Sequence, residues 1–393
     1  MSPTLVSPRP LGWLGIVRLG LVQTGLGAIV VLTTSTLNRV MVIELALPAM
    51  LPGALVAIHY VMQMLRPRLG HGSDVGGRRT PWIIGGMAVL ALGGTGAAGA
   101  VTLMGTHLAL GIALAVVSFV AIGLGVGAAG TSLLVLLAKR VDDRRKAAAA
   151  TIVWVMMIAG FIVTATTAGK FLDPYSPARL LAVAASVSAI AFIVTVLATW
   201  GVEGHGVART LAGREAEKVP FRVAMRETLA EPMARRFAIF VFISMLAYSG
   251  QDLILEPFAG LAFGYTPGQS TALAGVQNGG VLIGMILVGA LTAAVGGRTV
   301  GNLKYWALGG CLASAVALTG LAVGGHMAET WPLKANVFFL GFSNGVFAVA
   351  AIGAMMGFVG NGKENREGVR MGLWGAAQAI AFGVGGFLGT VAV

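Results

Sequence analysis

Charged residues are scarce in this sequence. Asp, Glu, Lys and Arg together make up 11% of its 393 residues, whereas soluble domains carry about 25%. Apolar residues reach 56%, above the roughly 45–50% of soluble domains. Such a chain needs a hydrocarbon environment, which excludes a soluble enzyme. The single cysteine, Cys311, also excludes a scaffold built on disulfides within the chain.

What the sequence does contain is long apolar runs. A run of about 20 apolar residues can cross a bilayer as a helix, because a helix pairs all of its backbone polar groups. We therefore predict an all-α integral membrane protein. Eleven such spans are expected, over 19–38, 46–65, 81–104, 108–138, 147–168, 180–200, 237–256, 269–296, 303–324, 331–358 and 370–393.

The basic residues predict the orientation of these spans. The net charge is +12, and 23 of the 27 Lys and Arg residues fall in connections on one side of the predicted bundle. Because basic loops stay in the cytoplasm, we expect a cytoplasmic N-terminus. The charge is then explained without nucleic acid as a partner. The basic loops are also expected to contact membrane lipids.

One long polar connection divides the spans. The predicted organisation is a six-span half over 1–200, a cytoplasmic linker over 201–236 and a second half over 237–393. The linker residues from Pro220 to Arg236 mix apolar and charged side chains as a short surface helix does. Whether that segment is a docking site or a solvated linker stays open on the sequence alone.

A glycine-rich, charged motif connects the second and third spans. Glycines permit a tight turn, an acidic residue can pair with helix N-termini and cations, and Pro81 suits a helix start. The motif resembles the G-x-x-x-D-R-x-G-R-R signature of the major facilitator superfamily, with Val75 in place of the first arginine. Its matching residues, to which we assign a conformational role, are Gly70, Asp74, Gly77, Arg78 and Arg79.

This resemblance implies a helix bundle of two six-helix halves, and two further expectations follow. Asp74 is expected to pair with Arg144 or Arg145 of a neighbouring connection. A degenerate copy of the motif over 289–298 indicates the second half. Because eleven spans are counted where the superfamily has twelve, the last span is expected to be missing from this sequence.

Other segments narrow the resemblance to one branch of the superfamily. They are the runs over 18–23, 36–44, 59–60, 66–74 and 251–258, and together they resemble the PucC/LhaA family of purple phototrophic bacteria. The resemblance implies a factor that assembles light-harvesting complexes, with bacteriochlorophyll a as cargo or bound pigment. Antenna polypeptides, and also pigment-synthesis enzymes, are the partners it implies.

Some members of that family carry the label bacteriochlorophyll synthase, which the residues allow us to weigh. Prenyl transfer needs clustered aspartates that hold Mg²⁺ and a diphosphate. The only adjacent pair, Asp142 and Asp143, lies in an ordinary basic connection. We therefore expect a protein that is not an enzyme. A secondary transporter of a small solute is the alternative, and a membrane enzyme of pigment synthesis is the weaker one.

Two groups of polar residues inside predicted spans are candidate binding residues. Gln251, Asp252 and Glu256 share one helix, where acids are expensive unless they serve coupling or substrate contact; the competing interpretation is an interfacial structural pair. His59 is a candidate axial ligand to the magnesium of a pigment, and Tyr60 and Gln63 are candidates to orient the ring. The competing interpretation of His59 is a histidine that is hydrogen-bonded between helices. No direct metal site of the protein itself is expected.

Overall fold

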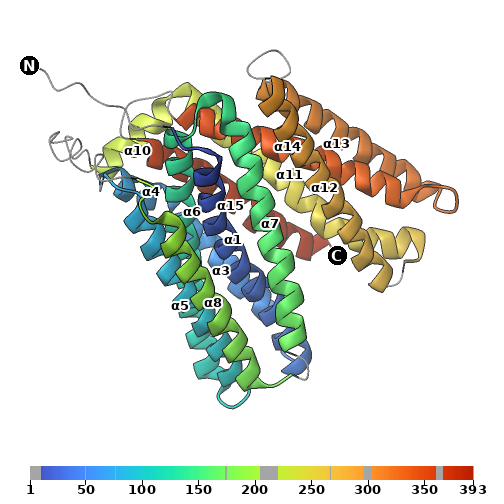
Figure 1. The fold of residues 1–393 in the computed structure, drawn as a ribbon. Coiled ribbons are helices and arrows are strands. Elements are labelled where there is room, and N and C mark those ends of the chain that lie inside the picture. Colours follow the sequence, from blue (N-terminus) through green and yellow to red (C-terminus); the bar gives the residue numbers. More distant parts are fainter. Residues whose placement is uncertain are drawn as a thin grey trace, which may run out of the picture. The chain divides into compact units, whose positions relative to one another are not determined.

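A computed structural model describes residues 10–48, 50–75, 77–172, 175–203, 220–265, 267–295, 302–359 and 366–392. Within these ranges the chain forms helices and no strand (Figure 1). In chain order they are α1 (Trp13–Val31), the π-helical η1 (Leu32–Thr36), α2 (Leu37–Arg39), the π-helical η2 (Val40–Glu44), α3 (Met50–Gln63), α4 (Arg66–Val75), α5 (Thr80–Met104), α6 (Leu108–Arg140), the 3-10 turn η3 (Asp143–Arg145), α7 (Lys146–Phe171), α8 (Pro177–Thr199), α10 (Phe221–Ala230), α11 (Pro232–Phe263), α12 (Pro267–Val295), α13 (Leu303–His326), α14 (Leu333–Val359) and α15 (Glu367–Ala392).

The predicted all-α membrane architecture is confirmed. Among the described residues, eight helical segments are long and apolar enough to cross a membrane. They are Trp13–Thr34, Thr80–Met104, Leu108–Arg140, Ala148–Ala165, Pro177–Thr199, Gly275–Thr292, Leu303–His326 and Leu333–Phe358. The other three expected spans fall on α3, α11 and α15.

The first helix differs from its expected boundaries. It begins at Trp13 rather than near residue 19, so Arg18 lies within the helix. The guanidinium of Arg18 donates to the carbonyl oxygens of Leu197 and Trp200 at the end of α8. A cation at a helix C-terminus satisfies carbonyls that have no partner within the helix. This explains why a charged residue is tolerated in an otherwise apolar helix.

Packing divides the chain into two compact units. The first comprises Met1–Val141, Met156–Ala238 and Val359–Ile380, and the second comprises Asp142–Val155, Ile239–Phe358 and Ala381–Val393. The first unit therefore holds the beginning of α15 together with helices from the first half of the sequence. The division predicted from the sequence, with a six-span half over 1–200, a linker over 201–236 and a second half over 237–393, stays a prediction.

Glycines let helices approach closely within each unit. In the first unit, a Cβ on Gly86 would lie 2.6 Å from the backbone nitrogen of Ala129, across the α5–α6 contact. In the second unit, a Cβ on Gly280 would lie 2.8 Å from the backbone nitrogen of Phe342 in α14. Such separations leave no room for a side chain, so these glycines set the distance between helices.

Candidate functional site

The glycine-rich motif forms the end of α4, a turn and the start of α5. Gly77 adopts a φ of 69°, a left-handed conformation that glycine accepts without strain. Pro81 stands in the first turn of α5, where its missing N–H wastes no hydrogen bond. The turn and the helix start expected from the sequence are therefore confirmed.

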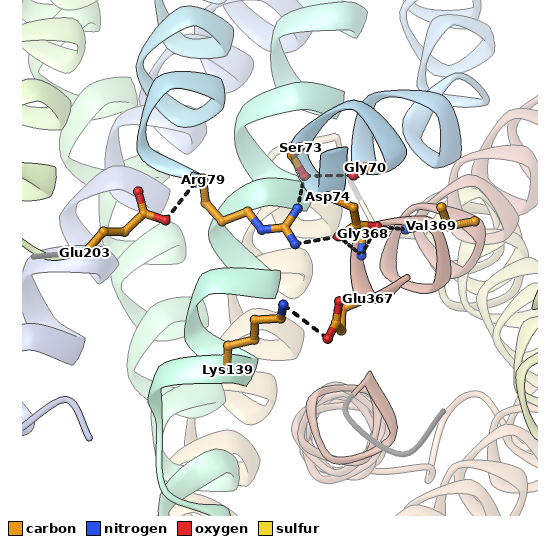
Figure 2. Close-up of polar contacts among 9 residues, drawn as sticks. All are labelled: Gly70, Ser73, Asp74, Arg79, Lys139, Glu203, Glu367, Gly368 and Val369. Carbon is orange, nitrogen blue, oxygen red and sulfur yellow. Dashed lines mark hydrogen bonds and ion pairs between the residues drawn. The ribbon is translucent and has the colours of Figure 1, made fainter. Parts of the chain in front are cut away.

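Asp74 of this motif caps a helix far away in the sequence. Its carboxylate accepts hydrogen bonds from the backbone N–H of Gly368, at 3.0 and 2.9 Å, and from that of Val369, at 3.2 Å. Both donors lie in the first turn of α15, as Figure 2 shows. The first N–H groups of a helix have no partner within it and carry partial positive charge. A carboxylate placed there stabilises the start of α15.

Two glycines make this cap sterically possible. A Cβ on Gly368 would lie 2.6 Å from the carbonyl carbon of Gly70 and 2.9 Å from Oδ1 of Asp74. A Cβ on Gly70 would collide in turn with the backbone of Gly368. The two backbones therefore touch directly, and the requirement for glycine at position 70 is steric.

Arg79 connects this cap to a second one. Its guanidinium donates to Asp74 and to the hydroxyl of Ser73, which itself donates to the carbonyl of Gly70 at 2.8 Å. The backbone N–H of Arg79 donates to Oε1 of Glu203 at 2.7 Å. Glu203 also accepts from the N–H of Thr80 at 2.9 Å, so it caps α5 as Asp74 caps α15 (Figure 2).

The carboxylate of Asp74 is buried, and burial has an electrostatic consequence. Burial raises the pKa of Asp74, while the neighbouring Arg79 and the amide of Gly368 act in the opposite direction. Nearby, Glu367 pairs with Lys139 at 3.1 Å. The structure thus gives Asp74 a cationic partner from its own motif, Arg79. The pairing expected with Arg144 or Arg145, which belong to the other compact unit, stays a prediction.

A ladder of contacts extends the attachment of α15. The described pairs are Arg366 with Glu227, and Arg370 with Glu231. Arg370 binds both oxygens of Glu231, from Nε at 2.8 Å and from Nη2 at 3.0 Å. One turn later, Nε1 of Trp374 donates to the carbonyl of Ala234 at 3.1 Å. Successive contacts four residues apart tie the start of α15 to α10 and α11 over two helical turns.

His59, Gln63 and Arg66 form a second polar cluster in the first unit. His59 and Gln63 are 3% and 4% exposed, and Nε2 of His59 lies 2.8 Å from Nε2 of Gln63. The guanidinium of Arg66 donates to Oε1 of Gln63. Because a guanidinium only donates, the Gln63 oxygen must face Arg66 and the amide nitrogen must face His59. Nε2 of His59 then accepts, and its proton sits on Nδ1.

This hydrogen-bond order bears on the pigment hypothesis. A magnesium ligand must offer a free imidazole lone pair, and here the lone pair of His59 is used by Gln63. Nδ1 is buried without a hydrogen-bond partner among the described residues. Tyr60 packs edge-on against the His59 ring, with centroids 5.1 Å apart. Ligation by His59 would require the Gln63 amide to turn over, against its bond to Arg66.

The other predicted polar group lies in the second unit. Oε1 of Gln251 accepts from Nδ2 of Asn344 at 2.9 Å, and the hydroxyl of Ser314 donates to Oδ1 of Asn344 at 2.6 Å. This chain of amide and hydroxyl groups links α11, α14 and α13. The side chains of Asp252 and Glu256 lie outside the described residues, as do residues 296–298 of the second motif copy.

Sequence reasoning missed most of the buried charges around the start of α15 and the start of α5. It treated the charges over 201–236 and 363–370 as ordinary residues of basic connections. The structure instead buries Glu203, Arg366, Glu367 and Arg370, which are 2–8% exposed. One signal was available for the ladder: Glu227 and Glu231 are four residues apart, and so are Arg366 and Arg370. Two matched i, i+4 pairs of opposite charge indicate helices that can pack in register.

Comparison with known proteins gives relatives along nearly the whole chain. The family model described as PUCC protein matches residues 36–393. The Rhodobacter capsulatus protein named "Bacteriochlorophyll synthase 44.5 kDa chain" is 55% identical over 381 residues, which cover 96% of this chain and 87% of that protein. "Protein PucC" of Cereibacter sphaeroides is 30% identical over 393 residues, with coverages of 94% and 81%.

Solved structures with a similar fold are transporters. The proton:xylose symporter XylE matches with a TM-score of 0.66 at 16% identity, covering 95% of this chain and 86% of the symporter. A bacterial homologue of the iron transporter ferroportin matches with a TM-score of 0.68 at 15% identity, covering 97% and 92%. At such identities the likeness shows the fold alone. It confirms the major facilitator-type helix bundle.

Proposed function

Because the chain belongs to the PucC family, we propose that it is an assembly factor for photosynthetic light-harvesting complexes. In this proposal it binds or delivers bacteriochlorophyll a, chaperones antenna polypeptides, or does both, without catalysing a covalent change. It works in the bacterial inner membrane with its N-terminus in the cytoplasm, next to the enzymes that make the pigment. We choose bacteriochlorophyll and antenna polypeptides as the cargo because the sequence resembles light-harvesting assembly proteins.

The observation that carries the proposal is the cap of α15 by Asp74. It joins residues 294 positions apart through hydrogen bonds from backbone N–H groups to the Asp74 carboxylate, and the Gly70 and Gly368 backbones touch directly beside it. Contacts of this kind can break and re-form without unfolding a helix. A transporter-type bundle with such a cap is suited to alternate between conformations. A carrier that takes up and releases a large amphiphile needs that property.

The buried acids are all bound by other groups of the protein, and this favours a carrier over an enzyme. Asp74, Glu203 and Glu367 are 6–9% exposed, and each is held by a cation or by backbone N–H groups. A general acid or base must instead be able to reach a substrate. A solute transporter remains the alternative, with the hydrogen-bonded group of Gln251, Asn344 and Ser314 as a candidate polar contact.

One observation favours a second candidate, an enzyme of bacteriochlorophyll synthesis. The relative with 55% identity bears the name "Bacteriochlorophyll synthase 44.5 kDa chain". If this chain shared such an activity, its loss would stop pigment synthesis itself. If the chain is an assembly factor, its loss would leave the pigment intact and affect only its delivery.

A deletion strain separates these functions. We expect the strain to keep making esterified bacteriochlorophyll and to accumulate less assembled antenna complex, measured by pigment extraction and by absorption of intact membranes. Affinity-tagged full-length protein should retain pigment or antenna polypeptide after purification in mild detergent. Accumulation of unesterified precursor would overturn the proposal in favour of the enzyme. Repeated purification with neither pigment nor antenna polypeptide would also overturn it.

A further inference from the structure

In the segment formed by α10 and the first residues of α11, the arginines are exposed and the acids are partly buried. Four of its arginines are exposed: Arg222, Arg226, Arg235 and Arg236. Among the described residues, no ion pair is recorded for any of the four. Its two acids, Glu227 and Glu231, are less exposed and pair with Arg366 and Arg370 of the α15 segment. Since the acids are neutralised on the inner side, the outer face presents positive charge alone.

Exposed apolar side chains lie between these arginines. Leu229 is 41% exposed and Met233 is 54% exposed, whereas Ala224, Thr228 and Ala234 on the opposite side are 0–2% exposed. In α10 the exposed residues 222, 226 and 229 recur at helical spacing, and residues 233 and 236 are exposed near the start of α11. Positions i, i+4 and i+7 share one face of α10, and the chain passes into α11 through the extended residue Glu231. We call these five residues and Arg235 the cationic stripe.

The stripe stands where a surface helix meets a spanning helix. α10 ends at Ala230 and α11 begins at Pro232, and residues 237–256 of α11 are predicted to cross the membrane. Further along the same helix, Ile239 and Ile243 are 52% and 60% exposed, as expected of side chains that contact acyl chains. The stripe thus immediately precedes the exposed apolar residues of a predicted span, and the polar end of a spanning helix is the part that meets lipid headgroups.

We propose that the cationic stripe binds the headgroups of anionic phospholipids. Guanidinium groups match phosphate oxygens with paired hydrogen bonds. A surface segment that exposes arginine together with leucine and methionine can set its apolar side chains into the interface while its charges meet phosphate. The ladder holds this segment against the start of α15, within the first unit. Anionic lipid bound there would therefore contact the same segment that anchors the start of α15.

The test measures lipid retention by the full-length protein in a neutral detergent. Native mass spectrometry would follow binding of added phosphatidylglycerol, which is anionic, and of phosphatidylcholine, which carries no net charge. The variant replaces Arg222, Arg226, Arg235 and Arg236 by Gln. A matched control replaces four exposed basic residues elsewhere, Arg68, Lys170, Lys304 and Lys334, by Gln. Each arginine near a lipid surface contributes about fivefold in affinity.

We expect the wild type and the control to prefer phosphatidylglycerol, and the four-arginine variant to lose at least about tenfold in affinity for it. Binding should also weaken in 1 M salt, where the screening length is about 3 Å. An unchanged preference in the variant, or an equal loss in the control, would overturn the proposal. If the variant fails to fold, the pair Arg222→Gln and Arg226→Gln tests the same surface. Wild-type protein that binds a polyglutamate peptide but shows no lipid preference would show that the stripe recruits an acidic protein instead.

Discussion

Asp74 caps helix α15 by accepting a hydrogen bond from the backbone N–H of Gly368. The carboxylate belongs to the motif that the sequence analysis singled out, whereas the amide belongs to a segment to which it gave no role. Because the donors are backbone N–H groups, replacing the residue at position 368 leaves these hydrogen-bond donors in place. Such a replacement acts by steric collision of the new side chain with its neighbours.

Replacing Gly368 by alanine should destabilise the protein. The new Cβ would lie within 3 Å of the Gly70 backbone and of Asp74, and overpacking of this kind costs about 1–3 kcal/mol. Thermal unfolding of the purified protein in detergent would show a lower midpoint. Gly309→Ala is the matched control, because nothing lies within 4 Å of a Cβ there. Equal midpoints for the two variants would contradict the close approach.

Asp74→Asn should change how stability depends on pH. Because burial raises the pKa of Asp74 above its ordinary 3.8, the folded state binds more protons than the unfolded chain between pH 3.8 and the raised value. The contribution of Asp74 to stability is therefore fully present below pH 3.8 and is lost as the pH rises through the raised pKa. The unfolding midpoint of the wild type relative to Asp74→Asn should rise on acidification from pH 7 to pH 4. A difference that changes in the opposite direction would mean that Arg79 and the α15 amides outweigh burial.

Arg370→Met should remove the ladder pair in which one guanidinium binds both carboxylate oxygens of Glu231. Arg370 is 2% exposed, and loss of one partner leaves Glu231 partly buried without its cation, at a cost of about 3 kcal/mol. The double variant Arg370→Met, Glu231→Met should recover most of that loss in the same unfolding assay. Arg78→Gln is the control, since its pair with Glu203 is 3.9 Å long and its side chain is 50% exposed. A loss there of more than about 1 kcal/mol would contradict this ranking.

Membrane orientation can be tested with single cysteines. In a Cys311→Ser background, Val75→Cys near the end of α4 should resist an impermeant thiol reagent in spheroplasts. Met327→Cys, in the turn after α13, should react. Both native side chains are about half exposed, so burial does not mask the result. Labelling of Val75→Cys together with protection of Met327→Cys would reverse the predicted topology.

The bonding order of Arg66, Gln63 and His59 predicts how these residues affect bound pigment. In the wild type the His59 lone pair is occupied, so His59→Leu should leave the amount of bacteriochlorophyll a retained by the purified protein unchanged. Gln63→Leu frees that lone pair, and any gain in pigment binding should disappear when His59→Leu is added. Loss of pigment in His59→Leu alone, with normal thermal unfolding, would show that His59 ligates magnesium despite Gln63.

The helices and the motif could be predicted because they depend on local sequence. Apolar runs gave the spans, and Gly77 and Pro81 marked the turn and the helix start next to Asp74. The partners of Asp74 could not be found in this way. Gly368 and Val369 bind through backbone amides, which every residue except proline has, so no side chain type marks them.

The buried charges were misjudged for a different reason. Arg370 and Glu231 look like ordinary residues of basic connections when each is considered alone. Their burial becomes favourable only once the two segments pack side by side and each charge satisfies the other. Likewise, the sequence left His59 open between a pigment ligand and a hydrogen-bonded histidine, because it could not show that Arg66 fixes the Gln63 amide and, with it, the imidazole proton.

The backbone contact between Gly70 and Gly368 has a consequence for reversibility. Side chains that interlock must give up rotamer freedom each time an interface closes, by up to about 2 kcal/mol for a long residue. Glycine has no rotamers to lose, and the cap beside it is formed by the short side chain of Asp74 and by backbone N–H groups. Forming the contact between Gly70 and Gly368 therefore costs no rotamer entropy at these two positions, whereas each long arginine of the ladder must be ordered when its ion pair forms.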